Sequence, residues 1–210
     1  MKNIAVLGKG SLAISVCQNI LESKEYNLVN VVPVLPEPTW TPSISNWCLD
    51  HGVSIIKSGD YNDLPSNSFD LGVSVFYDKI LSADYIKRCK RLINIHNAPL
   101  PKYRGMNPIN WALKNNETEH GTTIHNIEPG IDNGKIISQV KYSIFPSTDE
   151  VIDVYNRSLS YAKILFEETI NIIDDIVPVK QNENEATYYS QQDCDLLEER
   201  KNFTRRESLC

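Results

Sequence analysis

The chain has 210 residues, enough for one well-packed domain with a small appendage. Hydrophobic residues make up 41% and charged residues 23%, an ordinary globular balance. The net charge of −6 argues against a general polyanion binder, which needs a basic field, so we expect no nucleic-acid partner. No apolar run approaches the roughly 20 residues of a membrane span, so we expect no membrane partner.

Five cysteines are scattered along the chain and form no CxxC pair. This pattern favours reduced thiols over disulfides or a zinc site, so we expect a cytoplasmic protein without a bound metal. The N-terminal apolar stretch is too short for a signal peptide and predicts a first strand.

The first half of the chain alternates short apolar runs with helical stretches. Strands are expected at residues 4–7, 28–35, 53–56, 69–76 and 92–95, and helices at residues 12–21, 44–50 and 85–89. Continuous apolar strands separated by helices predict an α/β fold with a mostly parallel, twisted sheet covered on both faces. In such sheets, ligands bind beyond the carboxyl ends of the strands.

The second half changes pattern. We expect a helix at 107–113, strands at 122–127 and 135–144 around the Pro129-Gly130 turn, and a strand at 186–190. Ser147 and Glu150 predict a capping box before a long amphipathic helix that begins at Val151. We expect a catalytic domain at residues 1–178 and a short C-terminal extension at 179–210, with a frayed tail at 198–207.

Asn94 and His96 stand two positions apart at the end of an apolar run, so on a strand they point to the same face. Polar side chains on an inner face are costly unless they are paired or used. Asp132 lies between Gly130 and Gly134 in a turn that can aim its carboxylate inward. A lone histidine at a strand end is more often structural, but these neighbours favour catalysis. His51, His120 and His125 have no partner at metal-ligand spacing and are expected to be surface or strand histidines.

Gly8-x-Gly10-x-x-Ala13 follows a strand and precedes a helix, which partly satisfies the dinucleotide fingerprint. The acidic residue expected at the end of the second strand is missing, since Leu35-Pro36 stands there. Two readings stay open: a turn whose amides, with Lys9, hold a phosphate at a helix N-terminus, or a purely structural turn.

Several motifs together resemble the 10-formyltetrahydrofolate-dependent formyltransferases. The motifs are Asn94-Ile95-His96, Leu100-Pro101-Lys102-Tyr103-Arg104-Gly105, Pro108-Ile109-Asn110-Trp111-Ala112-Leu113, Gly121-Thr122-Thr123-Ile124-His125 and Gly130-Ile131-Asp132-Asn133-Gly134. The resemblance implies a Rossmann-like formyltransferase core and catalytic roles for Asn94, His96 and Asp132. It also implies a folate co-substrate held by Phe76, Tyr77, Lys79, Ile80, Leu81, Gly130 and Ile131. Since family members are often dimers, it suggests a homodimer.

Within this family the chain looks most like the short nucleotide-sugar N-formyltransferases. Methionyl-tRNA formyltransferases carry a further basic domain, and this acidic chain ends before one. Glycinamide ribonucleotide formyltransferases have about this length, but the segment from Arg104 to Trp111 departs from their usual sequence after the Leu100-Pro101-Lys102-Tyr103 element. The resemblance therefore implies formyl transfer to the amine of a nucleotide-linked amino-dideoxy sugar for cell-surface polysaccharide synthesis, with dTDP-4-amino-4,6-dideoxyglucose favoured. The alternatives are glycinamide ribonucleotide formyltransferase and, from another class, an NAD-binding oxidoreductase using Gly8 and Gly10. A catalytically inactive binding module is disfavoured by the intact Asn, His and Asp set.

The chemistry expected of this reaction assigns a role to each candidate residue. His96 is the expected general base, since a neutral imidazole is available at neutral pH. Asn94 is the expected donor to the developing oxyanion, and Asp132 the group that orients and supports His96 as it becomes charged. Candidates for binding the sugar nucleotide, through its diphosphate or by stacking, are Gly8, Lys9, Gly10, Trp40, Lys79, Lys102, Arg104, Trp111, Tyr188 and Tyr189.

Overall fold

The computed structural model describes residues 1–198. They form two compact units, one made of residues 1–95 and 126–129 and the other of residues 96–125 and 130 onward.

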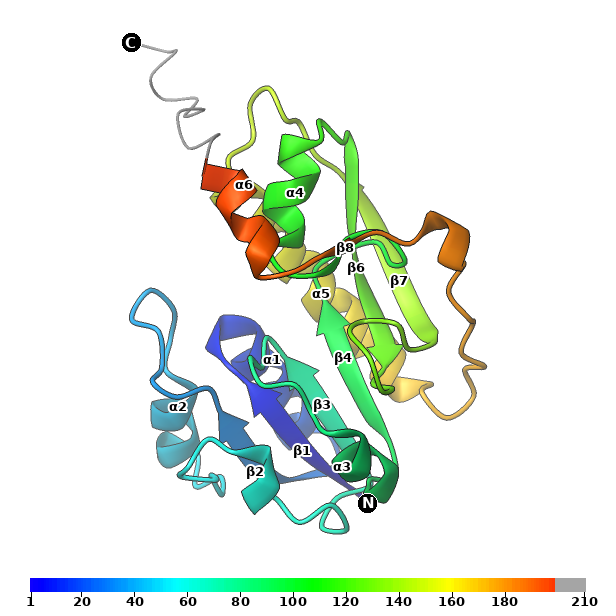
Figure 1. Ribbon diagram of the computed structural model, residues 1–210. Helices are drawn as coiled ribbons and strands as arrows, with labels where there is room; N and C mark the ends of the chain where they lie inside the picture. Colours follow the sequence, from blue (N-terminus) through cyan, green and yellow to red (C-terminus); the bar gives the residue numbers. More distant parts are fainter. Residues whose placement is uncertain (199–210) are drawn as a thin grey trace. The chain divides into compact units, whose positions relative to one another are not determined.

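The first unit is built on four parallel strands (Figure 1). They are β1 (Lys2–Gly8), β2 (Tyr26–Pro33), β3 (Leu71–Val75) and β4 (Leu92–His96), in the order β2-β1-β3-β4. All five residues of β3 are buried, as expected for a parallel strand covered on both faces. The predicted α/β fold with a parallel sheet is confirmed.

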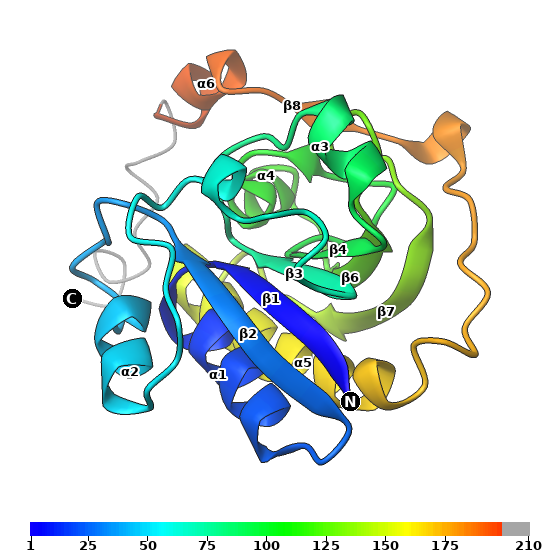
Figure 2. The same ribbon diagram turned by 90° about the horizontal axis from the view of Figure 1, so that it is seen from below.

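Helix α1 (Gly10–Glu22) packs along β1 and β2, as Figure 2 shows. Two shorter helices, α2 (Ile44–Asp50) and α3 (Ala83–Arg88), begin after serine N-caps. The Ser43 side chain accepts from the Asn46 amide and the Ser82 side chain from the Tyr85 amide, which satisfies donors that a helix start leaves open. A single 3-10 turn, Tyr61–Asp63, completes the unit.

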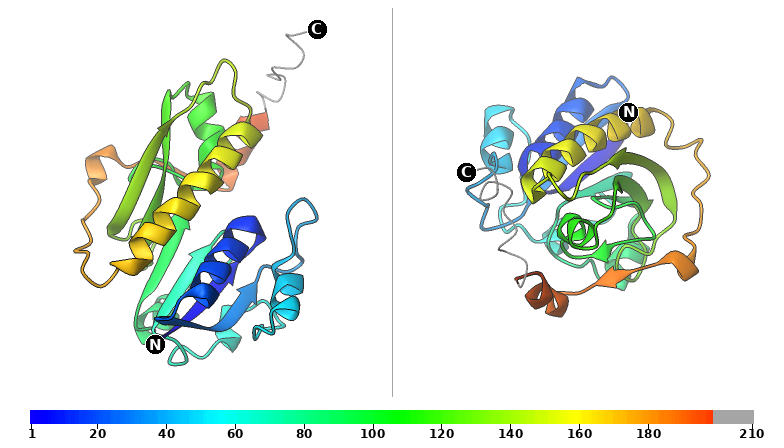
Figure 3. Two further views of the ribbon diagram at one scale, coloured as in Figure 1. Left: turned by 180° about the vertical axis from the view of Figure 1, so that it is seen from behind. Right: turned by 90° about the horizontal axis from the view of Figure 1, so that it is seen from above.

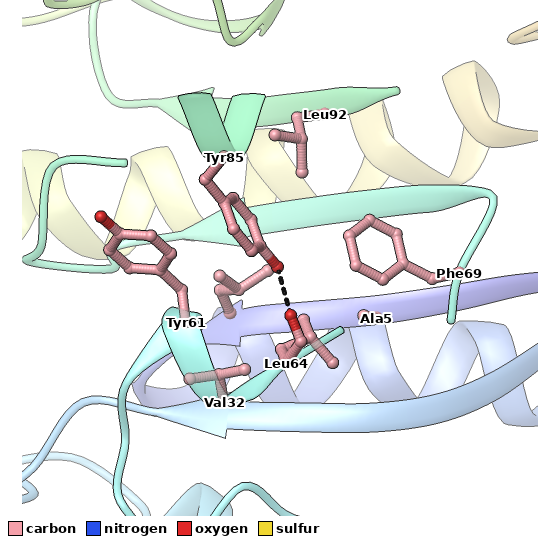
Figure 4. Packing of buried hydrophobic residues seen from close by; sticks show 8 residues of the cluster. Ala5, Val32, Tyr61, Leu64, Phe69, Tyr85 and Leu92 are labelled. Atoms are coloured by element: carbon pink, nitrogen blue, oxygen red, sulfur yellow. Dashed lines mark hydrogen bonds between the residues drawn. The ribbon is translucent and has the colours of Figure 1, made fainter. Parts of the chain in front are cut away.

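A hydrophobic cluster covers one face of this sheet (Figure 4). Ala5 and Leu7 alternate along β1 and pack in the same cluster as Tyr61 and Tyr85, which come from the connections that follow β2 and β3. The Tyr85 hydroxyl is buried and donates to the Leu64 carbonyl oxygen at 3.0 Å. The buried hydroxyl of Tyr85 thus has a hydrogen-bond partner. Through this cluster, the connections after β2 and β3 pack against the sheet.

The strand predicted at Val53–Ile56 is wrong. Ile55 forms only an isolated parallel bridge with Val31. The Val31 amide donates to the Ser54 oxygen and the Ile56 amide to the Val31 oxygen, and no further ladder follows. The apolar run is too short to extend the sheet beyond β2, because Gly52 and Gly59 bound it with positive φ of 66° and 62°.

The second unit contains an antiparallel pair, β6 (Glu119–Asn126) and β7 (Ile136–Ser143), as predicted around the Pro129-Gly130 turn. Helix α5 (Val151–Asn171) packs on β7 (Figure 3) and on α4 (Pro108–Lys114). A small parallel pair joins β5 (Arg104–Gly105) to β8 (Tyr188–Tyr189). Two 3-10 turns, Glu183–Glu185 and Gln192–Cys194, and helix α6 (Asp195–Glu198) complete this part.

The predicted capping box of α5 is displaced by three residues. The N-cap is Glu150, whose amide donates to the Asp153 carboxylate at 2.8 Å, while Ser147 lies in the preceding turn. That turn is closed by the Thr148 amide on the Phe145 oxygen, so the chain is not yet helical at Ser147. The predicted start of the helix at Val151 is correct.

Beyond Glu198, the predicted frayed tail lies outside the residues that the structure describes. Among residues 1–198, no helix combines the length and the apolar character needed to cross a bilayer.

Candidate active site

His96 is the last residue of β4 and is only 8% exposed. Its Nε2 lies 2.9 Å from the carbonyl oxygen of Tyr103. A carbonyl oxygen can only accept, so Nε2 carries the hydrogen in the neutral ring and Nδ1 keeps its lone pair. The backbone of Tyr103 thereby selects the tautomer in which Nδ1 is the basic nitrogen.

Asp132 occupies the turn between β6 and β7, with a side chain that is 14% exposed. Its Oδ2 lies 3.6 Å from the Nδ1 of His96 and accepts a hydrogen bond of 2.9 Å from the amide of Gly105. The turn does aim the carboxylate inward. Gly130 has a φ of 118°, and Asp132 itself takes a left-handed φ of 50°, which was not expected because glycines were available on both sides.

His125, on β6, is a second histidine beside the same carboxylate. Its Nε2 lies 3.4 Å from the Oδ1 of Asp132, and its ring stands edge-on to that of His96 with centroids 6.3 Å apart. It is 2% exposed. From the sequence, His125 was expected to be a surface or strand histidine. The available signal was its place in the Gly121-to-His125 motif, on a strand that leads into the turn of Asp132.

These neighbours set the ionisation of Asp132. Burial raises the pKa of this carboxyl, but the charge of His96, the contact with His125 and the Gly105 amide together hold the pKa well below its usual value. The carboxylate is therefore ionised at neutral pH, and it can stabilise an imidazolium beside it.

Asn94 lies two residues before His96 on β4 and belongs to the first unit. Its side chain is half-buried, and its partner in the ladder with β3 is Ser74. The strand prediction for Asn94 and His96 is thus correct, and the alternation of β4 projects the two side chains to the same face.

The segment that contacts both His96 and Asp132 is held by Thr187. The Tyr103 amide donates to the Thr187 Oγ1 at 2.7 Å, and the Arg104 amide to the Thr187 oxygen at 2.9 Å. A Cβ added to Gly105 would lie 2.2 Å from the Tyr189 oxygen, and Gly105 has a φ of 88°. Only glycine fits this position, where the backbone passes between β8 and the Asp132 carboxylate.

Arg104 does not offer a free guanidinium to a diphosphate. It is 8% exposed, and its nitrogens contact both carboxylate oxygens of Glu183, at 2.9 and 2.8 Å, and the side-chain oxygen of Gln181. The sequence-based choice of Arg104 as a substrate ligand overlooked these acceptors, which lie almost eighty residues further along the chain. Gln181 carried no signal in the sequence.

The four aromatic candidates for stacking fall into two groups. Trp111 is 4% exposed and stacks on Tyr189, with centroids 4.1 Å apart, in a cluster that also contains Tyr103. These residues form core rather than an open surface. Trp40 and Tyr188 lie at the surface instead, with 68% and 52% exposed.

The glycine turn after β1 has structural reasons of its own. A Cβ on Gly8 would lie 2.0 Å from the Val75 oxygen, and one on Gly10 would lie 2.7 Å from the Thr41 hydroxyl. The Lys9 amide donates to the Val75 oxygen at 3.2 Å. That amide is committed to the backbone, which favours the structural reading of the turn.

The expected folate segment follows β3. Phe76 has a positive φ of 56°, and the Tyr77 hydroxyl donates to the Gly59 oxygen and accepts from the Tyr61 amide. Leu81 packs against the core cluster, while Ile80 is 73% exposed. The loop is thus anchored at Tyr77 and Leu81 and presents Ile80 outward.

The remaining candidates lie near the surface. Gly130 adopts a positive φ, and Ile131 beside it is 37% exposed. Lys79 pairs with Asp60 at 3.2 Å, and Lys102 lies 3.7 Å from Glu117 with a side chain that is 52% exposed. Such exposed pairs are weak, so a bound anion can replace them.

Residues 61–170 match the formyl transferase family. A methionyl-tRNA formyltransferase from Ehrlichia ruminantium (strain Gardel) is 30% identical over 199 residues, which cover 88% of this chain and 65% of that protein. The chain thus spans somewhat less than two thirds of this relative's length.

Several solved structures are similar to this chain, among them the following two. WlaRD, a sugar 3N-formyl transferase crystallised in the presence of dTDP and 5-N-formyl-THF, is 28% identical with a TM-score of 0.81, covering 92% of this chain and 71% of that one. An N-formyltransferase from Helicobacter canadensis, in complex with folinic acid and dTDP-3-aminofucose, is 26% identical with a TM-score of 0.79, covering 92% and 72%. The chain belongs to the formyl transferase family, as its motifs predicted.

Proposed function

We propose that this protein transfers a formyl group from 10-formyltetrahydrofolate to the primary amine of a nucleotide-linked amino-dideoxy sugar. The observation that carries the proposal is the Asp132 carboxylate lying between the imidazoles of His96 and His125, in a chain of the formyl transferase family. The structures of WlaRD and of the Helicobacter canadensis enzyme, which were obtained with a folate compound and with dTDP or a dTDP-linked amino sugar, support both substrates.

In the proposed mechanism the sugar amine attacks the formyl carbon and forms a new C–N bond. His96 takes the proton that the amine loses, at Nδ1, because Nε2 already donates to Tyr103. The imidazolium that results faces the Asp132 carboxylate, which stabilises its charge without taking the proton. The Asn94 amide donates to the carbonyl oxygen as it becomes negative.

The second half of the reaction breaks the bond between the formyl carbon and N10 of the folate. The oxyanion collapses to a carbonyl, the electron pair of the broken bond goes to N10, and the proton held by His96 is delivered to that nitrogen. The products are the formamido sugar and tetrahydrofolate. No electron is gained or lost, so no redox partner is required.

We further propose that the sugar nucleotide is a dTDP sugar, with dTDP-4-amino-4,6-dideoxyglucose as the first candidate. Trp40 and Tyr188 are exposed aromatics that can stack on the base or sugar, and Lys9, Lys79 and Lys102 remain as candidate partners of the diphosphate. Arg104 is not among these candidates, because its guanidinium is bound to Glu183 and Gln181.

A substrate panel tests the proposal. Purified protein receives 10-formyltetrahydrofolate with dTDP sugars that carry the amine at carbon 3 or carbon 4, with their UDP counterparts, with glycinamide ribonucleotide, and with methionyl-tRNA. Mass spectrometry then reads the gain of one carbonyl on the acceptor. Turnover only of glycinamide ribonucleotide or methionyl-tRNA contradicts the sugar assignment. Absence of formyl transfer to every acceptor, together with binding of NAD, contradicts the enzyme class.

A further inference from the structure

We infer that Gln181 is a positioning residue for the Asp132 carboxylate, acting by holding the backbone of the turn that carries it. This inference rests on the proposed function, since it assigns Gln181 to the same site. The side-chain nitrogen of Gln181 donates to the backbone oxygens of Asp132 and Gly134, each at 2.7 Å. A primary amide has two N–H groups, so this fork uses both of its donors.

The turn needs such support. Asp132 has a left-handed φ of 50°, a region that non-glycine residues occupy only where their surroundings over-determine it. The two carbonyls that Gln181 binds stand at Asp132 itself and two residues later, so the fork fixes the peptide units on the carboxyl side of the strained residue. The direction of the Asp132 side chain depends on this backbone.

The other end of Gln181 is fixed by a buried arginine. Its Oε1 accepts from the Nε of Arg104 at 3.0 Å and from a terminal nitrogen of Arg104 at 2.7 Å. A guanidinium can only donate, so the amide oxygen must face Arg104 and the amide nitrogen must face the turn. The guanidinium is held in turn by both oxygens of Glu183. The orientation of the Gln181 amide is therefore determined by its partners.

Gln181 thus joins the two backbone segments that define the place of the carboxylate. One segment is the turn with Asp132, and the other contains Arg104 and Gly105, whose amide donates to the Asp132 Oδ2 at 2.9 Å. When the fork is lost, the carboxylate is free to move away from the Gly105 amide and from His96. Since a misplacement of about 1 Å can cost about 100-fold in rate, turnover is expected to fall more than substrate binding.

Two substitutions test this role. Gln181→Leu removes all four contacts at similar size. Gln181→Glu keeps an acceptor for Arg104 but has no N–H for the turn, so it isolates the fork. The matched control is Asn182→Ala, because the neighbouring Asn182 side chain donates to Glu185 at 2.8 Å and not to the turn. The measurements are kcat and KM for formyl transfer and the chemical shift of the Gly105 amide proton, which reports on its hydrogen bond to Asp132.

We expect both Gln181 variants to lower kcat by about 10- to 100-fold with KM changed by less than about threefold, and to move the Gly105 amide proton upfield. Asn182→Ala is expected to match the wild type in each readout. If Gln181→Leu does not fold, Gln181→Glu carries the test.

Wild-type kcat, or an unmoved Gly105 resonance, in a folded Gln181→Glu variant overturns the inference. If the wild-type protein transfers no formyl group, the proposed function fails instead. The Gly105 resonance then still decides whether Gln181 holds the Asp132 carboxylate.

Discussion

The imidazole of His96 donates through Nε2 to the backbone oxygen of Tyr103, at a distance of 2.9 Å. Because this bond engages one ring nitrogen, the basic nitrogen of the neutral ring is Nδ1, which lies 3.6 Å from the Oδ2 of Asp132. Two different residues thus act on the ring: the carbonyl of Tyr103 orients it, and the carboxylate of Asp132 stabilises its charge. A base held in this way has one nitrogen to offer to an incoming amine.

The first prediction concerns this nitrogen. His96→Gln retains an amide that can donate to the Tyr103 oxygen but has no basic atom, and His96→Ala loses both. Each is expected to lower turnover by roughly 100-fold or more while the protein stays folded. The matched control is His51→Gln, at an exposed histidine stacked on Trp47, which should keep wild-type turnover. Wild-type turnover in His96→Ala would refute the assignment of the base.

The second prediction concerns the charge of Asp132. Asp132→Asn preserves the shape of the side chain but removes the anion that faces His96 and His125, so turnover should fall by roughly 100-fold. Because its neighbours lower the pKa of this carboxyl in the folded protein, its ionised form stabilises the fold above its unfolded pKa of about 4. That stabilisation is lost as the pH falls through the lower, folded value.

Urea unfolding of the wild type and of Asp132→Asn at several pH values measures this difference. The free energy of unfolding should be higher for the wild type than for the variant, and the difference should be largest near neutral pH. This difference in free energy should become smaller below about pH 4. A gap that is constant with pH would show that ionised Asp132 adds nothing to stability.

Local pattern explains which parts could be predicted from the sequence. Buried parallel strands read as continuous apolar runs, so β1, β3 and β4 were found with small errors at their ends. His96 and Asp132 stood out because each lies where a structural residue would be unexpected, a strand end and a glycine-flanked turn, and the structure places their side chains 3.6 Å apart. The strand predicted at residues 53–56 was wrong, because an apolar run of four residues is too short to show the periodicity that would distinguish a strand from a single bridge.

The supporting residues depend on contacts between distant parts of the chain. Gln181 binds the turn of Asp132, which lies 49 residues earlier in the chain, and Arg104, which lies 77 residues earlier. Neither contact has a local sequence pattern, and a lone arginine near a motif looks the same whether it is paired or free. His125 was missed for a related reason, since its role depends on where the turn folds back, about seven residues further on.

The third prediction separates the two kinds of tryptophan. Trp111→Ala should lower the free energy of unfolding by about 3–5 kcal/mol, because this side chain is buried against Tyr189. Trp40→Ala should leave the free energy of unfolding nearly unchanged, because Trp40 is 68% exposed. If Trp40 stacks on the sugar nucleotide, the same substitution should raise the KM for that substrate by about 5- to 100-fold. Denaturant titration and steady-state kinetics of both variants measure this. An unaltered KM in Trp40→Ala removes Trp40 from the binding site.

The fourth prediction uses a buried histidine outside the proposed catalytic set. His120 is fully buried, and its Nε2 lies 2.8 Å from the Asn97 oxygen. Burial lowers the pKa of His120 to about 4, against the opposing effect of the Asn97 carbonyl. Between this value and the unfolded value of about 6.5, the unfolded state binds more protons, so stability falls as the pH decreases.

At about 1.4 kcal/mol per pH unit, the loss through this window is roughly 3 kcal/mol, and it levels off below about pH 4 because both states are then protonated. His120→Gln keeps a donor for the Asn97 oxygen but does not titrate, so its stability should fall less steeply over the same window. Urea unfolding of both proteins from about pH 7 to pH 4 provides the comparison. Equal slopes would mean that His120 takes up its proton in the folded protein as readily as in the unfolded chain, and that its burial is relieved before the fold opens.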